Sequence, residues 1–197
     1  MASIRIVAGL GNPGRRYAAT RHNAGFWFVD RLCDKLALSM TRESRFFSDV
    51  VKAGDCRLAK PSTYMNESGR AIAALLQFFG VSSNELLVVH DELDLKPGDA
   101  KLKYGGGVAG HNGLRDIREQ LGTEGFWRLR FGIGHPRDSA VPQQDVADYV
   151  LEPPRPEEKA LIDDAVQRAL ATWTDIAGGD MERAMMALHT KRIPDKP

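Results

Sequence analysis

Two short, strongly apolar segments constrain the fold of this chain more than any other feature. Residues 4–10 read Ile-Arg-Ile-Val-Ala-Gly-Leu and stop at a glycine-rich turn. Residues 85–90 read Glu-Leu-Leu-Val-Val-His and lead into Asp91 and Glu92. Strands this apolar are typical of the buried centre of a sheet that helices cover on both faces. The two segments therefore predict an α/β fold.

The remaining segments alternate between strand and helix patterns. Apolar residues at helical spacing predict helices at about 25–38, 67–79, 112–121, 156–177 and 180–190. Further strands are expected at 47–53, 56–60, 100–104 and 127–134. Because 47–53 and 56–60 form a hairpin around Gly54-Asp55, the sheet should be mixed. We expect one three-layer α/β domain over residues 1–197, a twisted mixed β-sheet flanked by helices. The proline-rich segment 136–151 is predicted to be a mobile lid, and 191–197 a flexible tail.

Composition fits a globular protein and excludes several classes. The apolar share is 43% and the charged share 27%, and no apolar run approaches the roughly 20 residues that span a bilayer. The first residues lack the layout of a signal peptide, and Cys33 and Cys56 lack a paired spacing. A cytoplasmic protein with two reduced thiols is expected. With a net charge of +1, any contact with RNA must come from a local basic patch.

The turn after the first strand, Gly9-Leu10-Gly11-Asn12-Pro13-Gly14, satisfies the G-x-G-x-x-G pattern of dinucleotide-binding folds. Such a fold opens a helix within this turn, whereas here a polar stretch delays the helix by about ten residues. The next strand also turns back as a hairpin. A dinucleotide site is therefore disfavoured. Asn12 remains as a polar residue at the end of a strand, where α/β folds bind ligands.

Several side chains could carry chemistry, and many follow predicted strands, whose ends converge in space. The candidates are Asn12, His22, Asn23, Asn66, His90, Asp91, Asp94, His111, Asn112 and His135. A histidine held by a carboxylate is a suitable general base near neutral pH, and amides suit an oxyanion or a peptide backbone. Without a G-x-S-x-G nucleophile motif, direct attack by water is the simplest hydrolytic scheme. No two histidines stand at i, i+4, so no metal site is indicated. Each candidate also has an ordinary structural role as a turn, cap or surface residue.

Two longer segments resemble a known family. Residues 17–30 (YAATRHNAGFWFVD) and 107–117 (GVAGHNGLRDI) are similar to the two signatures of bacterial peptidyl-tRNA hydrolases. Four blocks occur in the family's order: GLGNPG, TYMNESG, VVHDELD and RLRFGIGHP. The resemblance implies a monomeric, metal-independent esterase without a cofactor. Such an enzyme cleaves the ester of peptidyl-tRNA at the CCA end of the acceptor stem, and so recycles tRNA from prematurely released peptidyl-tRNA.

The resemblance also implies roles for individual residues. His22 would be the general base that activates water, Asp91 would hold its tautomer, and Asn12 would distinguish a blocked aminoacyl ester from a free one. The residues implied to bind substrate or tRNA are Tyr17, Tyr64, Met65, Asn66, Lys103, His111, Asn112 and Arg130. Lys103 and Arg130 match basic residues near the tRNA 5′ phosphate. Val108 departs from the family, many members of which carry a histidine there.

The strongest alternative is a non-catalytic RNA-binding relative of the same fold, similar to organellar splicing factors. It would keep basic surfaces and lose the base or the amides. Strand alternation places Lys101 and Lys103 on one face, and likewise Arg128 and Arg130. Because all matched catalytic positions are intact, the sequence favours the enzyme.

Overall fold

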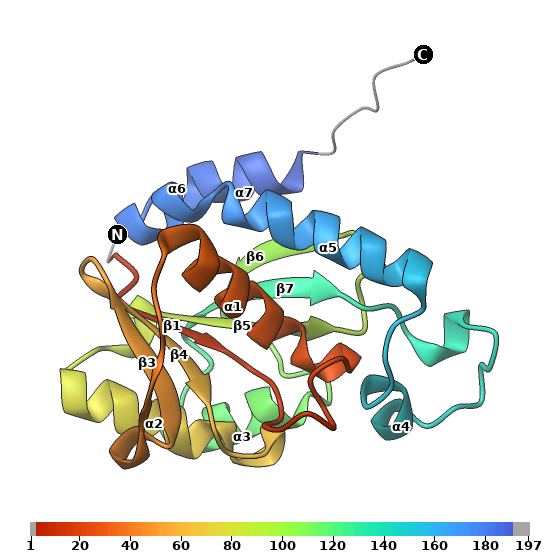
Figure 1. Cartoon of the computed structure of the whole chain (residues 1–197), viewed down its shortest axis with the longest axis horizontal. Helices are drawn as coiled ribbons and strands as arrows, with labels where there is room; N and C mark the ends of the chain where they lie inside the picture. Colours follow the sequence, from red (N-terminus) through yellow and green to blue (C-terminus); the bar gives the residue numbers. More distant parts are fainter. Residues whose placement is uncertain (1–2, 191–197) are drawn as a thin grey trace.

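A seven-stranded mixed sheet forms the centre of the chain in the computed structural model, which describes residues 3–190 (Figure 1). The strands are β1 Ile6–Gly9, β2 Thr41–Glu43, β3 Ser48–Ala53, β4 Cys56–Pro61, β5 Leu86–Glu92, β6 Ala100–Tyr104 and β7 Trp127–Gly132. Their order is β2-β3-β4-β1-β5-β7-β6. Strands β4, β1, β5 and β7 are parallel neighbours, whereas β3 and β6 run antiparallel to theirs.

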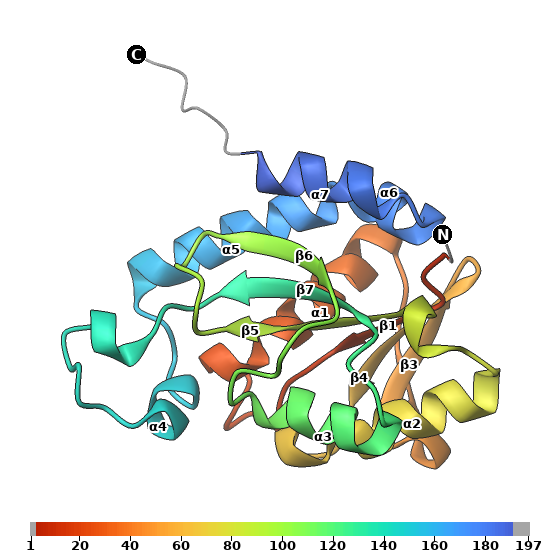
Figure 2. The ribbon, with the colours of Figure 1, turned by 180° about the vertical axis from the view of Figure 1, so that it is seen from behind.

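Helices cover both faces of the sheet, which gives three layers (Figure 1). They are α1 Ala24–Leu36, α2 Ser68–Phe79, α3 Asn112–Leu121, α4 Val146–Val150, α5 Pro156–Leu170, α6 Trp173–Gly178 and α7 Met181–His189. One apolar core lies between the sheet and α1, α5, α6 and α7, and a second lies between the sheet and α2 and α3. Figure 2 shows α2 and α3 together on the side of the sheet away from α5–α7. The predicted three-layer mixed α/β fold is confirmed.

Most predicted elements are present, including the 47–60 hairpin and the end of α2 at Gly80, which adopts φ 61°. Four details were wrong, and one of them is that helix α4 (Val146–Val150) was not predicted. The short exposed strand β2 was not expected, and β5 extends through Glu92, so Asp91 lies inside the strand. The helix predicted at 156–177 is two helices, because the chain bends at Thr172, whose hydroxyl donates to the carbonyl of Ala169.

The start of α1 lies unusually close to the sheet. A Cβ atom on Gly25 would lie only 2.3 Å from the carbonyl oxygen of Val89 and 2.5 Å from the nitrogen of Leu10. Only glycine permits this approach. It brings the turn that precedes α1, with His22, against the ends of β1 and β5.

Within residues 3–190, none of the helices combines the length and the apolarity needed to cross a bilayer. The predicted tail at 191–197 lies outside the described residues.

Candidate active site

The carboxyl ends of β1, β4 and β5 meet at one edge of the sheet, and polar residues gather there. Asn12 follows β1, Met65 follows β4, and Asp91 lies near the end of β5. His22 comes from the 3-10 turn before α1, and Asn112 is the first residue of α3. Together they border a cleft of ≈ 240 Å³, lined by Asn12, Tyr17, His22, Tyr64, Met65, Asn66, Asn112, Ala147, Val150 and Leu151. Such an edge is the usual ligand site of an α/β sheet.

Asp91 is held between two histidines. Nδ1 of His22 donates to Oδ2 of Asp91 at 2.8 Å, and Nε2 of His111 donates to Oδ1 at 2.9 Å. The carboxylate is almost fully buried, with 1% of its side chain exposed. Both of its oxygens are thus engaged, which fixes the orientation of the carboxylate and of the two rings.

The tautomers of the two histidines follow from their other partners. The backbone N–H of Leu114 donates to Nδ1 of His111 at 3.3 Å, so this nitrogen carries the lone pair and Nε2 carries the proton. Neutral His22, which donates through Nδ1, keeps its lone pair on Nε2, on the side of the ring away from Asp91. The hydrogen bonds therefore offer Nε2 of His22 as a base to the cleft.

Burial and neighbouring charges change the pKa values of both His22 and Asp91. Burial alone would lower the pKa of His22 and raise that of Asp91. Asp91 outweighs burial at His22 and raises the pKa of His22, whereas the charges and hydrogen bonds of His22 and His111 together hold the pKa of Asp91 well below its usual range. Asp91 therefore remains ionised throughout the range in which His22 titrates.

His90 does not share this role. It is fully buried, its Nδ1 donates to the backbone carbonyl of Asp91 at 2.8 Å, and burial lowers its pKa to about 3. A histidine in this state remains neutral near physiological pH. Asp94 is exposed and lines neither cavity next to His22.

Asn12 is fixed by two neighbours. The side chain of Asn23 accepts from the backbone N–H of Asn12 at 2.8 Å and donates to its carbonyl at 3.0 Å. The side-chain oxygen of Asn12 accepts from the backbone N–H of Met65 at 2.7 Å. Because the oxygen is used in this way, the NH₂ group is the half of the Asn12 amide left for a ligand.

The other predicted contacts also line the cleft. The rings of Tyr17 and Tyr64 pack edge to face with centroids 6.3 Å apart, and Tyr64 is largely exposed. Met65 is buried, and its sulfur would lie only 2.6 Å from a Cβ atom on Gly113, so the start of α3 packs directly against it. Asn66 and Asn112 are exposed along the wall.

A second recess lies beside His22, at ≈ 140 Å³, between the loop 109–112 and α4. The α4 wall is tethered to Arg21, the residue next to His22. Arg21 donates to the carbonyl of Tyr149 at 2.9 Å, and its guanidinium stacks on the Tyr149 ring at 3.9 Å. The end of the segment predicted to be a lid is thus anchored, and its motion stays a prediction.

Lys103 and Arg130 lie away from the cleft, on β6 and β7. The register pairs Lys101 with Arg130 and Lys103 with Arg128, so the four side chains share one face of the sheet, the side on which α3 lies. Lys101 and Lys103 are exposed, whereas Arg130 is half-buried and pairs with Glu92 at 3.3 Å. The basic patch expected from strand alternation is present.

Arg128 departs from that expectation. It is buried, with 2% of the residue exposed, and donates to the carbonyls of Gly107 at 2.5 Å and Gly106 at 2.6 Å. Its guanidinium therefore ties down the glycine loop that leads to His111 and is unavailable to RNA. The alternation gave the correct face, but it could not distinguish a buried arginine from an exposed one.

Sequence reasoning missed Arg21 as a structural partner of the site, it took Arg128 for a surface cation, and it named Asn23 as a candidate without giving it a role. It also grouped His111 with the substrate contacts, whereas both ring nitrogens of His111 are engaged within the protein. The available signal was the position of Arg21 and Asn23 on either side of His22. Nothing local indicated that His111 contacts Asp91, twenty residues away along the chain.

His22, Asp91 and His111 are also the one group among residues 3–190 whose donor atoms lie close enough, within 4.8 Å, to hold a metal ion. Their facing atoms are already joined as N–H donors and carboxylate acceptors. The hydrogen bonds account for the geometry without a bound ion.

Comparison with known proteins identifies the family. The model of the peptidyl-tRNA hydrolase family matches residues 6–196. The chain belongs to this family. It is 51% identical to the peptidyl-tRNA hydrolase of Azoarcus sp. (strain BH72), over 98% of this chain and 88% of that protein. It is also 51% identical to that of Nitrosospira multiformis, over 96% and 99%. The structure of the Acinetobacter baumannii peptidyl-tRNA hydrolase superposes with a TM-score of 0.88, at 40% identity over 95% of each chain.

These comparisons confirm the predicted family and a hydrolase that acts on peptidyl-tRNA. They give no support to the non-catalytic RNA-binding alternative. The roles of the individual residues are not tested by them and are proposed below.

Proposed function

We propose that this peptidyl-tRNA hydrolase cleaves the ester between peptide and tRNA by direct attack of water, with Nε2 of His22 as the general base. The observation that carries the proposal is the chain of hydrogen bonds that joins His22, Asp91 and His111. In this chain His22 donates through Nδ1, so its lone pair is on Nε2. Asp91 stabilises the imidazolium that forms when His22 accepts the proton of the water. An ester needs less help for its leaving group than an amide does, so one base suffices.

Amide groups and a helix end complete the site. Asn66 and Asn112 line the cleft on two sides, and Asn112 begins α3. The positive end of the α3 dipole favours the negative charge that develops on the carbonyl oxygen during attack. We propose that Asn112 and Asn66 bind the carbonyl groups around the scissile ester, next to Tyr17, Tyr64 and Met65.

The preference for a blocked amino group follows from the orientation of Asn12. Its side-chain oxygen is occupied by the N–H of Met65, which leaves the NH₂ group as a donor. A blocked aminoacyl group offers an acyl carbonyl that can accept this hydrogen. A free aminoacyl group offers an ammonium, which has no acceptor. We propose that Asn12 selects peptidyl-tRNA in this way.

The exposed lysines of β6, together with the half-buried Arg130 of β7, suit the tRNA. Lys101, Lys103 and Arg130 lie on one face, and Arg130 pairs with Glu92, which lines the recess beside His22. We propose that this face contacts the phosphates of the acceptor stem while the CCA end enters the site. Every group invoked comes from one chain, so a monomer is sufficient for the reaction, and we propose that it acts in the cytoplasm.

Cleavage of N-acetyl-aminoacyl-tRNA beside the unblocked aminoacyl-tRNA tests the proposal. We expect the blocked substrate to react at least about 100-fold faster in kcat/KM, because the donor of Asn12 lacks an acceptor in the unblocked one. Activity should persist in EDTA. In Asn12→Ala the ratio should fall, mostly through slower cleavage of the blocked form.

Equal rates for the two substrates would contradict the role of Asn12. Loss of activity in EDTA, restored by a divalent metal, would contradict the metal-free mechanism. Binding of the blocked substrate without any turnover would favour the RNA-binding alternative.

A further inference from the structure

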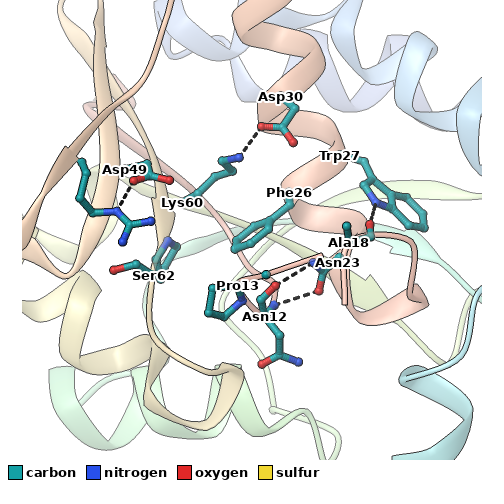
Figure 3. Close-up of a pocket in the computed structure, with 13 residues that line it drawn as sticks. Asn12, Pro13, Ala18, Asn23, Phe26, Trp27, Asp30, Asp49, Lys60 and Ser62 are labelled. Carbon is teal, nitrogen blue, oxygen red and sulfur yellow. Dashed lines mark hydrogen bonds and ion pairs between the residues drawn. The ribbon is translucent and has the colours of Figure 1, made fainter. Parts of the chain in front are cut away.

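A separate pocket lies on the other side of the Asn12 turn from the catalytic cleft (Figure 3). It has a volume of ≈ 220 Å³. Its walls come from the turn 12–14, Ala18, the first two turns of α1, β2, β3 and the end of β4. His22, Asp91 and the other reacting groups do not line it, and the mechanism above leaves it unused.

The pocket and the cleft adjoin each other at three places. Asn12 lines both of them. Ala18 lines the pocket while its neighbour Tyr17 lines the cleft, and Ser62 lines the pocket two residues before Tyr64 of the cleft. Figure 3 shows the side chain of Asn12 pointing away from Phe26 and toward the far side of the turn. The two cavities thus share Asn12, so a chain that extends from the cleft past Asn12 would meet the pocket on the other side of the turn.

The pocket has paired charges and flat apolar surfaces. Lys60 pairs with Asp30 at 2.6 Å, and Arg42 pairs with Asp49 at 2.5 Å. The apolar surfaces are those of Pro13, Phe26, Trp27 and Pro61. Two cations are thus balanced by two carboxylates, which is unfavourable for a phosphate backbone. Hydrogen-bond donors and acceptors that lie beside apolar surfaces suit a peptide of varied sequence.

We propose that this pocket binds the part of the peptide that precedes the esterified residue. The proposal rests on the proposed function, because it takes the scissile ester to lie at His22 and the acyl carbonyl of the blocked amino group to lie at Asn12. From Asn12 the next residues of an extended peptide advance by about 3.3 Å each, so a tetrapeptide extends beyond the cleft. N-acetyl-aminoacyl-tRNA is too short to use the pocket.

Filling the pocket at its rim tests this assignment. Ala18 is exposed, so Ala18→Trp places a large ring at the pocket without disturbing the core. Ala19→Trp is a matched control, because Ala19 is also exposed but lines neither cavity. We expect Ala18→Trp to lower kcat/KM for a tetrapeptidyl-tRNA about tenfold and to change that for N-acetyl-aminoacyl-tRNA less than about twofold. Ala19→Trp should leave both substrates within about twofold.

A second variant tests the pocket without adding bulk. The double change Asp30→Asn with Lys60→Met removes one ion pair and keeps the net charge, and it should weaken only the tetrapeptidyl substrate. Equal effects on the two substrates, or no effect of either variant on the longer one, would overturn the assignment. These results would leave the proposed function intact as long as the wild type cleaves N-acetyl-aminoacyl-tRNA. Failure of the wild type on that substrate would instead refute the proposed function.

Discussion

Replacement of His22 by alanine should reduce kcat by about 10²–10⁴-fold, the usual contribution of a positioned general base. The loss should appear in kcat more than in KM, because Asn12, Asn66 and Asn112 still bind the substrate. His22 lies in a short turn beside the cleft, but its ring is only 9% exposed and pairs with the buried Asp91, so a thermal melt of His22→Ala must accompany the kinetics to separate lost chemistry from lost fold.

The measurement is steady-state cleavage of N-acetyl-aminoacyl-tRNA by wild type, His22→Ala and the control His135→Ala. His135 caps a short turn and lines neither of the two cavities next to His22. The control should retain wild-type kcat. If His22→Ala were as active as the control, another group would have to be the base.

Replacement of Asp91 by asparagine should be nearly as damaging, although it is almost isosteric. An asparagine accepts with one atom and donates with the other, whereas Asp91 accepts from two histidines. His111 must keep its proton on Nε2, because Nδ1 accepts from the backbone of Leu114. The new NH₂ group then faces His22, which has to turn its lone pair to Nδ1 and carry its proton on Nε2. The base is lost through the wrong tautomer, as in the serine protease triad, where the same substitution costs about 10⁴-fold.

This prediction is tested by kcat for Asp91→Asn beside Asp94→Asn, an identical change at an exposed position on the same segment. We expect Asp91→Asn to lose about 10³-fold or more and Asp94→Asn to stay near wild type. A thermal melt of each variant separates lost chemistry from lost fold. If folded Asp91→Asn retained most of its activity, the tautomer argument would be wrong.

The sequence predicted the framework of this site because that framework depends on local pattern. Residues 85–90 are apolar enough to be a central strand, and Gly80 ends α2 with a positive φ, as expected for its position. Strand ends in a parallel sheet meet at one edge, so the placement of Asn12 and Asp91 at the same edge followed from the order of elements.

The parts that were missed depend on contacts between distant segments. His111 contacts Asp91, and Arg128 binds the carbonyls of the glycine loop that leads to His111; neither contact has a local signature in the sequence. The break at Thr172 falls within a continuous helical pattern, and the contact that marks it in the structure is the hydrogen bond from the Thr172 hydroxyl to the carbonyl of Ala169. Strand β2 is exposed, so it lacks the apolar alternation by which strands are recognised.

The central claim is that the neutral form of His22, held by Asp91, is the active base, and the pH dependence of kcat/KM tests it most directly. The pKa of His22 is raised above 6.5, so protonation should remove the base as the pH falls through that raised value. Asp91 stays ionised over the same range, so a single protonation should govern the acid limb, with an apparent pKa that belongs to the coupled group. The account predicts that kcat/KM for N-acetyl-aminoacyl-tRNA falls tenfold per pH unit below an apparent pKa above 6.5. A profile that is flat between about pH 5 and 8, or one that rises as the pH falls, would contradict it.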